Sequence, residues 1–170
     1  QGEKVFSGAG EEVKVWNESA SRGGGTIYRG LNEWGDGIYV TDSPNYAKTY
    51  GAKITESTVK PNLKLFDVRD SATISEIQKT KIIGAFKEQY GKSLKSGFTQ
   101  DITKALKEAD SPKDFFDILQ NEIGTYTTDV LKKSGFDGII ADESKMNGGN
   151  IVGGKVYNIF DPKNIQTKSQ

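Results

Sequence analysis

Strand patterns at both ends of the chain, with a helical pattern between them, constrain the fold more than any other feature. Within residues 73–133 apolar residues recur at three- and four-residue spacing, which predicts three or four helices. One helix is expected to start at Ser111-Pro112, because a capping serine, a proline and an early Asp114 are typical of a helix N-terminus. Segregated strands and helices predict an α+β fold. The strand-type runs are residues 13–16, 26–28, 38–41, 53–60, 63–68, 135–141 and 156–162.

The chain has 170 residues, with no cysteine and no histidine. This length allows one domain, spanning residues 1–170, to bury a core without disulfides or a metal. The missing residue types exclude thiol and histidine catalysis and the common zinc sites, so no metal is expected. A formal net charge of zero does not support a nucleic-acid surface built on bulk positive charge, but it leaves a local basic groove open.

Residues 26–51 combine two strand-type runs with groups suited to binding a ligand. The first run ends in Arg29-Gly30, which places a guanidinium where a strand passes into a loop. A Gly-Asp-Gly turn precedes the second run, and Ser43-Pro44 then predicts the start of a helix that leads to Tyr50. This stretch is therefore the candidate ligand site.

Two groups of motifs resemble the ADP-ribosyltransferase superfamily, whose members cleave NAD. The first, in the order of its polymerase-like branch, is Tyr28-Arg29-Gly30, the Gly-Asp-Gly-Ile-Tyr-Val run at 35–40, and Tyr50. The second, near the end of the chain, is Gly-Phe-Asp-Gly-Ile-Ile at 135–140 and Phe-Asp-Pro at 160–162, followed by Ile165. The resemblance implies a split β-sandwich of two antiparallel sheets around an NAD cleft. The helical block, about residues 73–133, would be inserted after the fourth or fifth strand.

The resemblance also implies roles for single residues. Tyr39 and Tyr50 would sandwich the nicotinamide ring of NAD, which is the substrate. Arg29 stands where the polymerase-like branch has histidine, and it is similar to the toxin-branch arginine that binds the phosphates of NAD. Gly30 would lie beside it, and hydroxyl contacts would come from Thr41 and Ser43. Structural roles stay open for these residues: Tyr39 in the core, Tyr50 packing its helix, Ser43 capping that helix, and Arg29 in a surface ion pair.

Two residues of the family pattern are missing. Val156 stands where active members place the catalytic glutamate, and Ala47 replaces a serine that contacts nicotinamide. Because valine cannot hold a ribose hydroxyl, single transfer is expected rather than polymer synthesis. Positive charge still develops on the sugar as nicotinamide leaves, so a carboxylate is needed, and Glu143 is the nearest candidate. A solvated loop position is its alternative role. The expected catalytic residues are Arg29, Tyr39 and Glu143.

The favoured function is an NAD-dependent mono-ADP-ribosyltransferase acting on a macromolecular acceptor, as a bacterial toxin or effector module. The resemblance implies a secreted or phage-packaged parent protein, action in a target-cell cytoplasm, a monomer, and a cognate immunity protein as partner. A chain that begins with glutamine is expected to be a piece of a longer protein, and no apolar run long enough for a membrane is present. Two alternatives stay open: an inactive domain of this fold that binds NAD or a macromolecule, and an NAD glycohydrolase.

A glycine-rich segment separates the last two predicted strands. Residues 144–154 contain four glycines and two asparagines. Such a composition favours a mobile loop, and loops beside a site often act as lids or recognise the substrate. We therefore expect a mobile loop here that acts as a lid or as a substrate-recognition loop.

Overall fold

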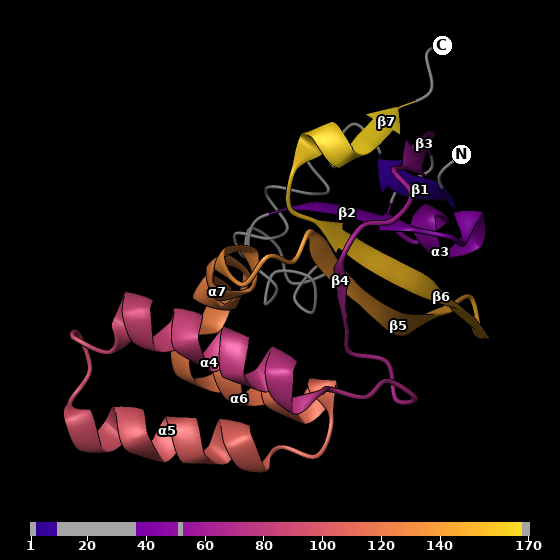
Figure 1. Ribbon diagram of the computed structural model, residues 1–170. Coiled ribbons are helices and arrows are strands. Elements are labelled where there is room, and N and C mark those ends of the chain that lie inside the picture. Colours follow the sequence, from indigo (N-terminus) through magenta and orange to yellow (C-terminus); the bar gives the residue numbers. More distant parts are fainter. Residues whose placement is uncertain (1–2, 10–36, 51–52, 168–170) are drawn as a thin grey trace.

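The computed structural model describes residues 3–9, 37–50 and 53–167, and these residues form an α+β fold, as expected (Figure 1). Their strands join one sheet in the order β4-β5-β6-β2-β1-β3-β7. Neighbouring strands run antiparallel except β4 and β5, which are parallel. The strands are β1 (Glu3–Ala9), β2 (Ile38–Thr41), β3 (Lys53–Val59), β4 (Leu65–Asp67), β5 (Gly138–Asn147), β6 (Asn150–Ile159) and β7 (Ile165–Thr167).

The sheet is narrowest where β1 meets β2. Within the described residues, these two strands pair only at Phe6 and Thr41. By contrast, β1 pairs with β3 along its whole length, and β2 pairs with β6 along its whole length. The joint therefore separates a half made of β4, β5, β6 and β2 from a half made of β1, β3 and β7.

A block of helices follows β4 and precedes β5 (Figure 1). The predicted start at Ser111 is confirmed, because its hydroxyl accepts a hydrogen bond from the Asp114 amide at 3.1 Å and Pro112 follows it. Ser75 and Gln78 form a capping box at the start of the first helix of the block. The helices are α3 (Pro44–Lys48), which lies outside the block after β2, and then α4 (Glu76–Tyr90), α5 (Ser96–Glu108), α6 (Pro112–Ile123) and α7 (Thr127–Lys133).

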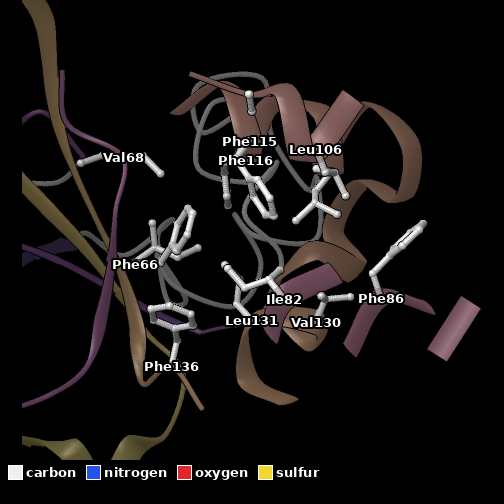
Figure 2. Close-up of a cluster of buried hydrophobic side chains, with 14 of the residues drawn as sticks. Phe66, Val68, Ile82, Phe86, Leu106, Phe115, Phe116, Val130, Leu131 and Phe136 are labelled. Carbon is white, nitrogen blue, oxygen red and sulfur yellow. The ribbon is translucent and has the colours of Figure 1, made fainter. Parts of the chain in front are cut away.

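The main hydrophobic core lies between the helical block and one face of the sheet, as Figure 2 shows. Phe66 on β4 is the link, because its ring lies 6.4 Å from Phe115, 6.2 Å from Phe116 and 5.3 Å from Phe136, measured between centroids. Complete burial of each such side chain stabilises the fold by roughly 1.5–3 kcal/mol. The helices and the sheet therefore share one core.

A second cluster lies on the opposite face of the sheet. It contains side chains from both halves: Val5, Val40, Val59, Ile140, Tyr157 and Ile159. Successive residues of a strand point to opposite faces, so Val40 belongs to this cluster whereas its neighbours Tyr39 and Thr41 point towards the helices. The period of two residues in the sequence thus assigns each side chain of β2 to a face.

The prediction of a mobile loop at residues 144–154, acting as a lid or in substrate recognition, is wrong. Strands β5 and β6 continue through this segment as a hairpin, and pair as far as Asn147 and Asn150. Gly148 and Gly149 form the turn with φ values of 59° and 85°, a left-handed conformation that glycine adopts readily. The glycines therefore close a tight turn, and the ladder satisfies the backbone on both sides of it.

Two described strands were not expected from the sequence, namely β1 and β7. Each has few large apolar residues, so neither shows a clear alternating pattern. The strand-type runs predicted at residues 13–16 and 26–28 lie outside the described residues. In the described part of the chain, no helix has the length and apolar character needed to cross a membrane.

Candidate functional site

Register across three strands places three of the predicted site residues, Tyr39, Thr41 and Glu143, on one face. Glu143 on β5 is opposite Gly154 on β6, and Thr41 on β2 is opposite Val156. Val156 is in turn opposite Ala141, two residues before Glu143, so Glu143, Gly154 and Thr41 project from the same side of the sheet. This side also carries Tyr39 and faces the helices.

Three tyrosines lie in the main core: Tyr39 on β2, Tyr46 on α3, and Tyr50 in the turn after α3. Tyr39 is fully buried, Tyr46 is 3% exposed and Tyr50 is 6% exposed. The hydroxyls of Tyr46 and Tyr50 share a buried hydrogen bond of 2.9 Å, and their rings meet edge to face with centroids 5.5 Å apart. Burial of this kind is what a core role requires, so a ring-stacking role for Tyr39 and Tyr50 stays a prediction.

Tyr46 was not singled out from the sequence. It precedes Tyr50 by four residues, and residues at this spacing on a helical turn are neighbours. The i, i+4 pair of tyrosines is therefore the signal that would have identified it.

Lys145 lies above the Tyr50 ring. Its ammonium nitrogen is 4.5 Å from the ring centroid, at the distance of a cation–π contact. Desolvation lowers the pKa of Lys145. Since Lys145 follows Glu143 by two residues on β5, both side chains face the tyrosines from the same strand.

Glu143 connects the tyrosines to a cavity. It lines a space of about 360 Å³ that also borders the segment after β4 and the inner side of α6. Burial raises the pKa of the Tyr46 hydroxyl, the bond with Tyr50 opposes this shift, and the negative charge of Glu143 raises the pKa further. The half-buried carboxylate therefore acts on the tyrosine cluster and also borders the cavity.

The cavity wall is polar and carries charges of both signs. Arg69 lines it, and its guanidinium grips Asp67 through two hydrogen bonds of 2.9 and 2.7 Å, which lower the pKa of the Asp67 carboxyl. Asp117 on α6 also lines it, and desolvation raises the pKa of this carboxyl against the opposing effect of Lys113. No sequence motif connects these residues, because they come from separate elements.

The hydroxyls of Thr41 and Ser43 hold the backbone at the end of β2. Thr41 donates to the Lys155 carbonyl at 2.6 Å, and its oxygen accepts from the Ser43 amide at 3.2 Å. Ser43 caps α3 by accepting from the Tyr46 amide at 3.1 Å, which confirms the capping role considered for it. A side-chain contact from either hydroxyl to a ligand stays a prediction.

Gly154 allows the strands to approach at this point. A Cβ atom there would lie 2.7 Å from the Ser43 Cβ and 3.1 Å from the Thr41 hydroxyl oxygen. Glycine thus brings the end of β2 close to β6 directly opposite Glu143. The structure therefore places Thr41, Ser43 and Glu143 around one position.

The remaining predicted residues fall into two groups. Arg29 and Gly30 lie outside the described residues. Ala47 and Val156, the two departures from the family pattern, are both buried, with Val156 fully enclosed in the main core. Within the described part of the chain, no group of three or more acidic side chains is arranged to hold a metal ion. Comparisons with models of protein families, with curated proteins and with solved structures find no match.

Proposed function

We propose that the protein is an NAD-dependent mono-ADP-ribosyltransferase with Glu143 as its catalytic carboxylate. One observation carries the proposal: Glu143, which is remote in sequence from the Tyr39–Tyr50 segment, lies on the same sheet face and acts electrostatically on Tyr46. Aromatic rings near a carboxylate that itself lines a cavity of about 360 Å³ suit a flat leaving ring and a sugar that develops positive charge. The family motifs in the sequence add the identity of the substrate.

In the proposed chemistry, Glu143 assists both the cleavage of NAD and the attack of the acceptor. The bond between the ribose carbon and the nicotinamide nitrogen breaks, and its electron pair passes to the departing ring. A nucleophile of the acceptor then bonds to the same carbon and releases a proton. Glu143 stabilises the positive charge on the sugar and takes this proton, as carboxylates do in glycoside cleavage. Arg29 holds the diphosphate in this scheme.

Tyr50 can offer a ring face to nicotinamide only after the ammonium group of Lys145 has moved off that face. In the structure the ammonium of Lys145 occupies that face at 4.5 Å. Desolvation already disfavours the charged form of Lys145, so replacing it with a flat ring returns the ammonium to water. Binding of the substrate therefore moves Lys145 away from Tyr50.

A split between two sheets, as in the family, is also part of this proposal. The narrow joint between β1 and β2 supports it, because only Phe6 and Thr41 pair there among the described residues. The second hydrophobic cluster also supports it, since Val5 and Val59 from one half gather with Ile140 and Tyr157 from the other. The effector role and the macromolecular acceptor are proposed from the same resemblance.

The buried Val156 favours one rival, an inactive domain of this fold that binds NAD or a macromolecule. Val156 is fully buried at the position of the family glutamate, so no carboxylate can act from there. In this rival, Glu143 keeps a purely structural role. The two proposals differ in turnover, since both retain a binding site.

The deciding experiment incubates the protein with NAD labelled in its adenylate portion, together with a cell lysate. Label on a protein or nucleic acid supports transfer, whereas free labelled ADP-ribose supports the glycohydrolase. No product despite binding of NAD in calorimetry supports the inactive domain. Polymeric products would contradict single transfer, because the fold lacks a carboxylate at Val156. Arg29→Ala serves as the binding control, since it should abolish the calorimetric signal.

A further inference from the structure

A second hollow lies between α4 and α5. Its volume is about 480 Å³, and three lysines line it, Lys87 from α4 and Lys104 and Lys107 from α5. Its lining also includes Thr99, Gln100 and Thr103. Among the described residues that form this lining there is no carboxylate. We call this hollow the α4–α5 groove, and Figure 1 shows its two helices side by side, with α5 at the edge of the molecule away from the sheet.

One face of α5 forms most of the groove. Residues three or four positions apart are neighbours on a helix, so Thr99, Thr103 and Lys107 make one row, and Lys104 lies beside it. The row runs over nine residues, and the eight steps between its ends correspond to about 12 Å of helix. The groove is therefore long enough to contact more than one anionic group.

The helix dipole explains the positions of only two of these lysines. Lys87 and Lys107 stand in the last turns of α4 and α5, where a cation interacts favourably with the helix dipole. Lys104 is not in a last turn, yet it lines the same hollow. The buried Lys79 already satisfies carbonyl groups at the C-terminal end of α5, because its ammonium donates hydrogen bonds to the carbonyls of Lys107 and Ala109 at 3.0 and 2.7 Å. The three exposed lysines therefore give this hollow a local positive charge that an anionic ligand can contact.

We propose that the α4–α5 groove binds phosphate groups, either of a free polyphosphate or of a single-stranded nucleic-acid backbone. Lysine ammonium groups bind phosphate as point charges, and a concave surface of one sign raises the local concentration of counter-ions. The net charge of the chain is zero, so the groove is a local feature rather than a consequence of overall charge. The volume of about 480 Å³ falls in the range of small-ligand sites. This site does not depend on the proposed transferase activity.

The test compares the wild type with a variant in which all three groove lysines become glutamine, which keeps helix propensity high. Probes are inorganic tripolyphosphate in calorimetry and a labelled single-stranded oligonucleotide in fluorescence anisotropy. The control variant changes Lys60, Lys132 and Lys133, which are exposed and lie outside the groove, so both variants lose the same charge. We expect the groove variant to bind about tenfold or more weakly, and the control less than about threefold.

Salt dependence gives a second readout. Three lysine–phosphate contacts on a single strand predict a slope of about −2 for log K against log salt, and the groove variant should bring this slope close to zero. Binding of the oligonucleotide identifies a strand as the ligand, and binding of tripolyphosphate alone identifies a free polyphosphate. Absence of binding for both probes, or an equal loss in both variants, would overturn the proposal. If the triple variant unfolds in circular dichroism, Lys104→Gln alone replaces it, with an expected loss of a few-fold in affinity.

Discussion

The face around Glu143 and the α4–α5 groove both gather polar residues, but they are assembled differently. The first combines residues from β5, α3 and α6, which are distant in sequence, and mixes charges of both signs with buried tyrosines. The groove comes from two consecutive helices, and its charged lining is lysine. Local helical spacing is enough to build the groove, whereas only the tertiary fold can build the other site. The two sites should therefore respond differently to mutation.

The largest expected effect is the loss of the core that both sites share. Phe115→Ala removes a fully buried ring on α6 that packs against Phe66 on β4, and should destabilise the fold by about 3–5 kcal/mol. Urea unfolding, followed by both fluorescence and circular dichroism, measures the change. Phe98→Ala on α5 is the control, because 47% of that side chain is exposed and its loss should cost far less. Two separate transitions in the wild type would show that the helical block and the sheet unfold independently.

The next effect separates the two sites. Glu143→Gln should lower kcat for NAD turnover by about 10² or more while leaving NAD affinity nearly unchanged, because the carboxylate acts as charge develops on the sugar. Steady-state kinetics and calorimetry with NAD give the two numbers. Glu122→Gln on α6 is the matched control, since it makes the same change at an exposed position outside the cavity. Wild-type turnover in Glu143→Gln would remove this residue from the mechanism.

A smaller effect tests whether the tyrosines serve a ligand or only the core. Tyr50→Ala should cost roughly 1–3 kcal/mol in NAD binding, the scale for one aromatic face, whereas Tyr50→Phe keeps the ring and should cost far less. Tyr50→Phe also removes the hydroxyl bond to Tyr46 and should lower stability by about 1 kcal/mol. Tyr126→Ala, at a residue 60% exposed, is the control for general loss of aromatic area. Equal NAD affinity in stable Tyr50→Ala protein would make Tyr50 a core residue alone.

Local patterns in the sequence predict helices and strands well where a residue pattern is typical of only one local structure. Ser43-Pro44 and Ser111-Pro112 start helices as expected, and Ile38–Thr41 forms β2. The glycines at 148 and 149 were misread, because glycine serves both mobile loops and tight turns and only pairing with another strand distinguishes them. Strand order is also not a local property, so the narrow joint between β1 and β2 had no signal in the sequence.

The candidate site was predictable only in part for the same reason. A family motif indicated Tyr50, and the missing glutamate at Val156 led to Glu143 as the nearest carboxylate, but the contact of Lys145 with Tyr50 depends on how β5 lies against the turn after α3. Arg69 and Asp117 enter the cavity from β4's end and from α6, and neither belongs to a motif. The lysines of the α4–α5 groove follow helical spacing, so a search for polar stripes on predicted helices would have found them.

The smallest expected effect concerns the charge of Asp117, which has no counterpart in the groove. Desolvation raises the pKa of Asp117, so the folded state binds its proton more tightly than the unfolded state does. Its contribution to stability is therefore present below the ordinary carboxyl pKa and is lost as the pH rises through the raised value. Asp117→Asn should thus increase stability slightly at pH 7, by no more than about 0.5 kcal/mol because the side chain is well exposed, and should change stability little near pH 3.

Asp67→Asn should change stability in the opposite direction, since Arg69 lowers the pKa of Asp67 and stabilises its charged form above the ordinary carboxyl pKa. Urea unfolding of both variants at the two pH values measures these differences, and a loss of stability at pH 7 in Asp117→Asn would mean that its carboxylate is stabilised by a partner in the cavity.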